Sequence, residues 1–65
     1  MSNRIKDYLF RTRRFWVSTS ELTRMFAAGR PHARRQVWVI MRRLESYGIV
    51  QRDSREDATY WKYKV

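Results

Sequence analysis

The stretch ARRQVWVIMRRLESYGIV, residues 33–50, holds the side chains best suited to recognising another molecule. Turned at about 100° per residue, its apolar positions share one helical face: Ala33, Val37, Ile40, Met41 and Leu44. The other side carries Arg35, Val39, Arg42 and Ser46 opposite the apolar face, with Arg34, Trp38 and Arg43 on the flanks. Arginine presents a planar fork that suits phosphate and guanine edges. This amphipathic pattern therefore predicts a helix that binds nucleic acid.

The overall charge favours the same class of partner. The 65 residues include 15 Lys and Arg against six Asp and Glu, a formal net charge of +9. Such an excess attracts a small protein to polyanions at long range. An acidic protein or an anionic membrane would also suit the charge, but no long basic amphipathic helix with a broad apolar face is present. The remaining alternative is a charge that only maintains solubility.

The composition predicts one small folded domain, residues 1–65, without catalytic chemistry. Three Trp, four Tyr and three Phe provide material for a core. There is no cysteine, and His32 is the one histidine, so we expect no disulfide, metal site or cofactor. The carboxylates are scattered and there are only two glycines, so we expect no enzyme. No apolar run approaches the roughly 20 residues of a membrane span, and no signal-peptide core is evident, so we expect a cytoplasmic protein that binds no membrane.

Two helices are expected in the first half of the chain. Ser2 is a plausible N-cap for a helix over residues 3–13, and residues 15–17 (FWV) are a candidate strand. Phe15 and Trp16 straddle that strand, so one of them should point inward. Ser18 and Glu21 match a capping box that opens a helix over residues 19–28. That helix should place Leu22, Met25 and Phe26 on one face.

The second half predicts a helix followed by a hairpin. Gly29 can end the preceding helix, and Pro31 can open a helix over residues 31–47 that stops at Gly48. Residues 49–52 read as a strand and residues 53–58 as a polar turn. Residues 59–65 then alternate Thr59, Trp61, Tyr63 and Val65 with Tyr60, Lys62 and Lys64, which predicts a second strand. We expect a hairpin over residues 49–65, with Trp61 and Tyr63 on the core side and Tyr60 exposed near its base.

This order of elements resembles the winged helix-turn-helix superfamily. The resemblance rests on VSTSELTRMF (residues 17–26) and on VIMRRLESYGIVQR (residues 39–52) and covers nearly the whole chain. It is similar above all to the small single-domain regulators of bacteria, phages and plasmids, including those that control pilus phase variation. The resemblance implies an α+β fold of three helices and a small antiparallel sheet whose hairpin forms the wing. It also implies that the third helix enters the major groove of double-stranded DNA.

The resemblance assigns two sets of DNA contacts. The base-reading positions on the third helix are Arg34, Arg35, Gln36, Trp38, Val39 and Arg42. The positions that would contact the DNA backbone are Arg14, Ser18, Thr19, Ser20, Arg30, His32, Arg43, Arg52, Arg55, Lys62 and Lys64. Arginine and glutamine are the types that bond guanine and adenine edges, and valine can touch a thymine methyl group. The alternative is that these arginines are an ordinary solvated helix face.

The start of the second helix, Trp38 and Arg55 need separate expectations. If Ser18 caps its helix, Thr19 and Ser20 should have hydroxyls free to bind phosphate. Trp38 either packs partly against the rest of the domain or contacts DNA or a second copy. Arg55 could extend from the wing tip towards DNA.

The turn of the wing departs from the usual basic character of such wings. Asp53, Glu56 and Asp57 surround Arg55 and should repel phosphate. The turn should then contribute little to DNA binding, while strand residues such as Arg52 and Lys62 contact phosphates. A further alternative is that this acidic tip meets the basic face of another copy, as a dimer or an array on DNA.

Two functions follow from these observations. The first is sequence-specific DNA binding, as a transcriptional regulator or as an architectural or recombination accessory factor. The second is a protein-interaction module that binds a polymerase, a replisome component or another regulator. The arginines of the third helix favour the first, and the acidic turn with Trp38 and Val39 would fit the second.

Overall fold

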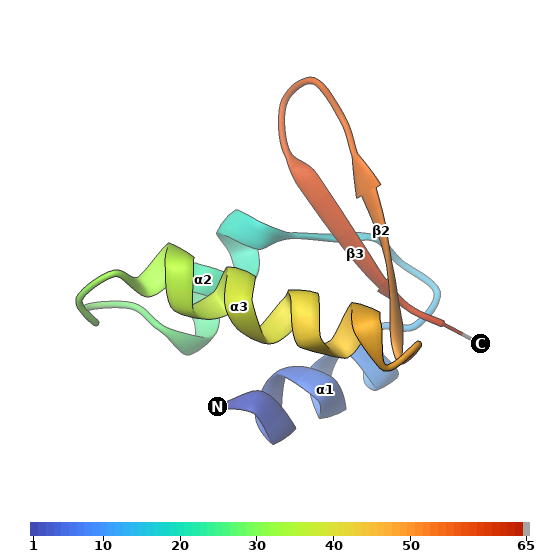
Figure 1. The fold of residues 1–65 in the computed structure, drawn as a ribbon, viewed down its shortest axis with the longest axis horizontal. Helices are drawn as coiled ribbons and strands as arrows, with labels where there is room; N and C mark the ends of the chain where they lie inside the picture. The colour runs from blue at the N-terminus through green and yellow to red at the C-terminus, as the bar shows by residue number, and fades with distance from the viewer. Residues whose placement is uncertain (65) are drawn as a thin grey trace.

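The computed structural model describes residues 1–64 and consists of three helices and a small sheet (Figure 1). The elements are α1 (Ser2–Arg11), β1 (Val17–Ser18), α2 (Thr19–Phe26), α3 (Ala33–Ser46), β2 (Val50–Ser54) and β3 (Thr59–Tyr63). The strands pair antiparallel in the order β1-β3-β2. The predicted α+β class, with three helices and an antiparallel hairpin, is confirmed. No helix within residues 1–64 combines the length and apolar character needed to cross a bilayer.

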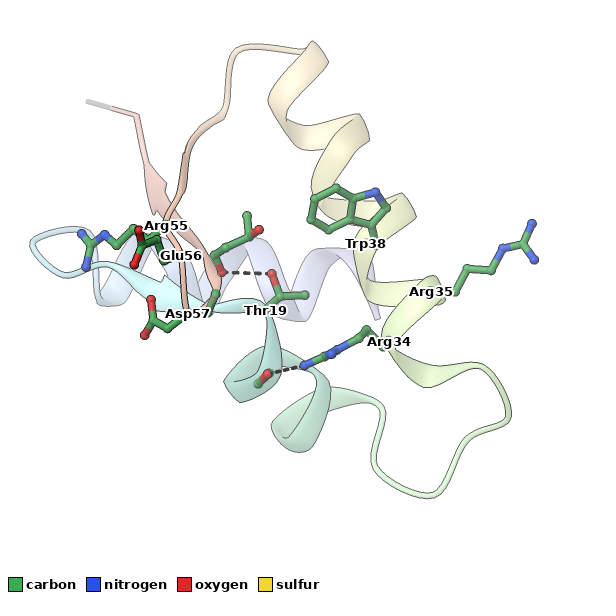
Figure 2. A pocket seen from close by; sticks show the side chains of 10 residues that line it. Thr19, Arg34, Arg35, Trp38, Arg55, Glu56 and Asp57 are labelled. Carbon is green, nitrogen blue, oxygen red and sulfur yellow. Dashed lines mark hydrogen bonds between the residues drawn. The ribbon is translucent and has the colours of Figure 1, made fainter.

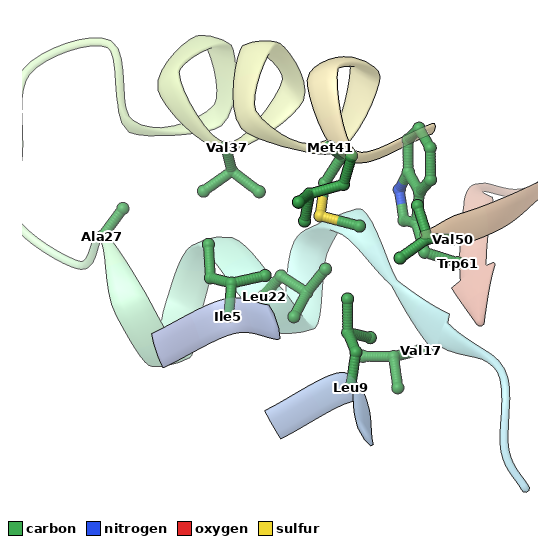
Figure 3. Close-up of a cluster of buried hydrophobic side chains, with 10 residues drawn as sticks. Ile5, Leu9, Val17, Leu22, Ala27, Val37, Met41, Val50 and Trp61 are labelled. Atoms are coloured by element: carbon green, nitrogen blue, oxygen red, sulfur yellow. The ribbon is translucent and has the colours of Figure 1, made fainter. Parts of the chain in front are cut away.

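The core lies between α1 and α3 and is closed by the sheet. Figure 3 shows Val37 and Met41 of α3 pointing towards α1, while Ile5 of α1 points back towards them. The buried apolar residues are Ile5, Leu9, Val17, Leu22, Ala27, Val37, Met41, Leu44, Val50 and Trp61. Trp61 is fully buried, as predicted. These residues come from every element, so no single helix could bury its apolar face alone.

The predicted first helix is two residues too long at its C-terminal end. The chain leaves helical geometry at Thr12, whose hydroxyl donates a hydrogen bond to the Tyr8 carbonyl at 3.0 Å. The Phe15 amide then donates to the Thr12 carbonyl at 2.8 Å, which closes a turn. At the other end, Met1 occupies the N-cap position, so the prediction of Ser2 as the cap is wrong. At the C-terminal end, the hydrogen bond from the Thr12 side chain to the Tyr8 carbonyl competes with continuation of the helix.

The predicted start of α2 is confirmed, whereas its end is not. The Ser18 hydroxyl accepts a hydrogen bond from the Glu21 amide at 3.1 Å, which is one half of the capping box. The helix ends at Phe26 rather than at residue 28, because Ala27 turns away from helical geometry and is buried. The expectation that Met25 shares one face with Leu22 and Phe26 is wrong, since Leu22 is fully buried and Met25 is 48% exposed.

The start of α3 differs from prediction. The helix begins at Ala33, because His32 adopts a left-handed conformation with φ of 53° that cannot continue a right-handed helix. The prediction that Pro31 opens the helix is therefore wrong. The predicted stop is close to the observed one, with Gly48 at φ of 76° just beyond the C-cap Tyr47. Glycine takes this conformation without the Cβ penalty of other residues.

The β2–β3 hairpin is longer on its first strand than predicted. Asp53 and Ser54 lie in β2 opposite Tyr60 and Thr59, so the turn covers only residues 55–58. The Arg55 amide closes it by donating to the Ala58 carbonyl at 2.9 Å. The sequence predicts that the second strand reaches Val65, but β3 ends at Tyr63 and Lys64 lies beyond it; Val65 itself lies outside the described residues.

The aromatic residues expected beside the core occupy intermediate positions. Tyr63 is half-buried and packs edge-on against Phe10, with ring centroids 5.2 Å apart. Trp16 is half-buried and Phe15 is 68% exposed, so neither reaches the core. The inward position belongs to Val17, because β1 begins two residues later than the apolar triplet suggested. Tyr60, expected to be exposed, is also half-buried.

Candidate nucleic-acid interface

The outer face of α3 is open to solvent, as its pattern predicted. All of the polar residues proposed there are exposed: Arg34, Arg35, Gln36, Arg42 and Arg43. Val39, the apolar residue among them, is 44% exposed. The opposite face packs into the core through Val37, Met41 and Leu44, which fixes the orientation of the helix. A fixed helix with an uncovered basic face is suited to docking against a large, negatively charged surface.

The first turn of α3 is tied to the first turn of α2. The Arg34 guanidinium donates a hydrogen bond to the Ser20 hydroxyl, and Figure 2 shows this link across the gap between the two helices. Arg35 extends away from the same region in Figure 2 and has no acidic partner among residues 1–64. The two neighbouring arginines therefore differ: Arg34 is positioned by α2, whereas Arg35 is available.

A cleft of about 670 Å³ separates these arginines from the β2–β3 turn (Figure 2). It is lined by Thr19, Ser20, Arg34, Arg35, Trp38, Arg55, Glu56, Asp57, Ala58 and Thr59. One wall is basic and belongs to α3, and the other is acidic and belongs to the turn. An elongated anion would favour the α3 wall and avoid the turn.

Trp38 lies at the boundary between this cleft and the core. Its ring meets Trp61 edge-on, with centroids 5.5 Å apart and an interplanar angle of 71°. The side chain is half-buried, so the predicted partial packing is confirmed. Because one part of the ring still lines the cleft, Trp38 supports the shape of the site and remains accessible to a ligand.

The expectation that Thr19 has a free hydroxyl is wrong. Thr19 is only 7% exposed, and its Oγ1 accepts a hydrogen bond from the Trp61 indole N–H at 2.7 Å. The same hydroxyl donates to the Thr59 carbonyl at 3.1 Å. Thr19 therefore joins the start of α2 to β3, and its hydroxyl cannot bind phosphate. The sequence contained no local signal for this role, because the partners lie about 40 residues away.

Arg55 does not extend freely from the hairpin. Its Nε lies 2.8 Å from Asp53 Oδ2, and its Cζ lies 4.4 Å from the centre of the Tyr60 ring. The hydrogen bond to Asp53 raises the pKa of the Arg55 guanidinium further above its ordinary value. The Tyr60 hydroxyl donates to Asp57 at 3.0 Å, which raises the pKa of the Tyr60 phenol. The turn is thus partly neutralised by the Arg55–Asp53 pair, whereas Glu56 and Asp57 keep it acidic.

The C-terminal half of α3 is also partly neutralised. Glu45 accepts contacts from Arg42 at 3.2 Å and from Arg52 of β2 at 3.3 Å. Both arginines belong to the predicted DNA-binding set, and each keeps part of its side chain exposed. The i,i+3 spacing of Arg42 and Glu45 could have predicted the first pair. The second pair depends on how β2 packs beside α3.

The remaining predicted residues are distributed unevenly around the molecule. Arg30 and His32 are exposed in the α2–α3 loop beside the start of α3. Lys62 lies over the Trp16 ring, with Nζ 5.6 Å from its centre, and Lys64 is exposed after β3. Arg14 lies in the α1–β1 turn, remote from the N-terminal half of α3 (Figure 1).

The structure therefore brings together a smaller set than the sequence proposed. Ser20, Arg34, Arg35 and Trp38 share the cleft, and Gln36 and Val39 continue the same exposed face. Neither family models nor curated proteins nor solved structures gave a match to this chain. Inference about function therefore rests on the site itself.

Proposed function

We propose that this protein binds double-stranded DNA sequence-specifically as a winged helix-turn-helix domain, with the N-terminal half of α3 in the major groove. The observation that carries this proposal is the exposed edge formed by Arg35, Gln36 and Val39 on a helix whose opposite face is locked in the core. An α-helix fits the major groove, where each base pair presents a distinct pattern of donors and acceptors. The order of α2, α3 and the β2–β3 hairpin supports the winged-helix assignment.

The contacts divide into base reading and backbone positioning. Arg35 and Gln36 carry the side-chain types that bond guanine and adenine edges, and Val39 offers an apolar contact to thymine. Arg34, held against Ser20, is suited to a phosphate at the edge of the groove, with Arg30 and His32 beside it. Backbone contacts set the register of the helix, and base contacts provide the sequence preference. In the cell, this activity suits a transcriptional regulator or an architectural or recombination accessory factor.

A second candidate function is binding to another protein. The acidic β2–β3 turn favours it, because Glu56 and Asp57 line the cleft and would repel a phosphate backbone there. A shallow hollow of about 340 Å³ beside Val39, lined also by Met1 and Ile40, offers apolar contact area. A protein partner would contact the same end of α3 as DNA would. DNA binding and protein binding are therefore alternative uses of one surface.

The first experiment measures binding to labelled random duplex DNA by fluorescence anisotropy at two salt concentrations. We expect binding that weakens steeply as salt increases, because neutralised phosphates release counterions. A duplex selected from a random pool would then identify the preferred sequence. Absence of binding at low salt would contradict DNA binding and favour the protein-interaction function.

The second experiment tests base reading directly. Arg35→Ala should weaken binding to the preferred duplex by about 1–3 kcal/mol, which is roughly 5- to 150-fold. Arg4→Ala is the matched control, since it removes the same charge from an exposed position on α1. Equal losses for Arg35→Ala on preferred and random duplexes would contradict a base-reading role.

A further inference from the structure

A second concentration of positive charge lies at the C-terminal end of α1 and in the turn after it. Arg11, Arg13 and Arg14 are all exposed, and together they form what we call the rear patch. No ion pair within the described part of the chain involves any of them. Residues 1–14 contain five cationic side chains and a single acid, Asp7. Arg11, at the C-terminus of α1, complements the helix dipole. This effect fades beyond the last turn, so it does not account for Arg13 and Arg14, which lie past the end of the helix.

Arg13 is held in a defined position within the rear patch. Its Nη1 donates to the Phe10 carbonyl at 3.1 Å, and its Cζ lies 4.7 Å from the centre of the Phe10 ring. Phe10 in turn packs against Tyr63 of β3, so the contact is fastened to the sheet. A guanidinium has five N–H donors, and this arrangement uses one of them. The others are available for a bidentate contact with phosphate.

The backbone segment that carries the rear patch lies far from the start of α3. In Figure 3 the core side chains of α3 and α1 point towards each other, so the two helices lie on opposite sides of the core. Figure 1 places the α1–β1 turn beyond the base of the β2–β3 hairpin, at the other end of the molecule from the start of α3. A duplex docked on Arg35 and Gln36 would therefore leave the rear patch uncovered.

We propose that the rear patch binds the phosphate backbone of a second DNA segment, so that one copy of this protein bridges two duplexes. This inference rests on the proposed function of α3. The shortest dimension of the molecule is 20 Å, whereas electrostatic screening acts over about 8 Å at physiological ionic strength. Two duplexes held on opposite faces would therefore repel each other only weakly. Three phosphate contacts predict a salt dependence for this second site with a log–log slope of about −2.7.

The test uses the full chain, a duplex immobilised on beads and a second, labelled duplex in solution. The wild-type protein should capture the labelled duplex. A triple variant removes the charges of the rear patch: Arg11→Gln, Arg13→Gln and Arg14→Gln. Its capture of the labelled duplex should fall by about tenfold or more, whereas its affinity for a single duplex should change by less than about threefold. A control carrying Arg4→Gln, Lys6→Gln and Arg24→Gln removes the same three charges from other exposed positions and should still capture.

The outcomes separate this proposal from the function of α3. If the protein binds single duplexes but captures no second one, bridging is overturned and DNA binding stands; if it binds no duplex, both fail. Equal loss of capture in the control would show a net-charge effect and overturn the proposal. Equal losses in capture and single-duplex affinity would place the rear patch on the same duplex and also overturn it. Capture by a dimer, detected by sedimentation and unaffected by the three rear-patch substitutions, would do the same.

Discussion

Thr19→Val should destabilise the protein strongly although it barely changes the size of the side chain. Thr19 Oγ1 is the shared partner of the Trp61 indole N–H, at 2.7 Å, and of the Thr59 carbonyl, at 3.1 Å. Valine removes both hydrogen bonds and keeps the β-branched shape. The indole N–H would then be buried without an acceptor, because Trp61 is fully buried.

The expected loss can be worked from these two contacts. A buried donor left unsatisfied costs about 1–3 kcal/mol. The Thr59 carbonyl belongs to a half-buried residue, so water can replace its lost partner at a cost of under about 1 kcal/mol. The sum is a loss of about 1–4 kcal/mol from the free energy of unfolding. That is a large share of the roughly 3–10 kcal/mol expected for a domain of this size.

Urea unfolding followed by tryptophan fluorescence measures this loss. With an m-value of about 1 kcal/mol per molar urea, the midpoint should fall by about 1–4 M. Thr19→Ser is the control, because it keeps the hydroxyl and loses one methyl group at a cost of about 1 kcal/mol. A loss below about 0.5 kcal/mol for Thr19→Val, or an equal loss for both variants, would refute the role assigned to this hydroxyl.

Three further predictions concern local contacts. Ser18→Ala should lower the free energy of unfolding by about 1 kcal/mol, because α2 loses its N-cap hydrogen bond. The control is Ser20→Ala, since Ser20 is exposed and does not cap the helix. In the same urea assay it should cost less than about half as much. Gly48→Ala should cost about 1 kcal/mol in thermal unfolding, because a Cβ at φ of 76° is strained even where space is open; an unchanged melting temperature would contradict this. The bond from the Tyr60 hydroxyl to Asp57 stabilises the protonated phenol, so its contribution is present at neutral pH and is lost as the pH rises through the raised pKa. Asp57→Asn should therefore lower the pKa of Tyr60 in an NMR titration, and an unshifted titration would show that Asp57 is not the cause.

The elements themselves were largely predictable from local patterns. The apolar spacing of α3, the Ser18 cap and the alternation around Trp61 each depend on residues within about one or two turns of one another. The failures cluster where a competing local bond ends an element early or an unusual conformation delays its start. Thr12 bonds back to Tyr8, and His32 turns left-handed, and neither event changes the apolar periodicity.

The site was predictable only in outline. The sequence predicted which face of α3 would be exposed, because amphipathic periodicity determines that face once the opposite one is buried. It could not predict that Glu45 would meet Arg52, since that pair requires β2 to pack beside α3. It also could not separate Arg34, which is held by Ser20, from its neighbour Arg35.

The sequence by itself determined the number and type of elements, the basic character of the protein and the exposed face of α3. These properties depend on composition and on short-range spacing. The tertiary structure alone decided which polar groups remain available. Folding buried the Thr19 hydroxyl against Trp61, paired Arg52 with Glu45 and placed α1 across the core from α3. Each of these outcomes depends on residues that are adjacent in space but not in sequence, or on the direction in which a helix faces, and neither is encoded in a local pattern.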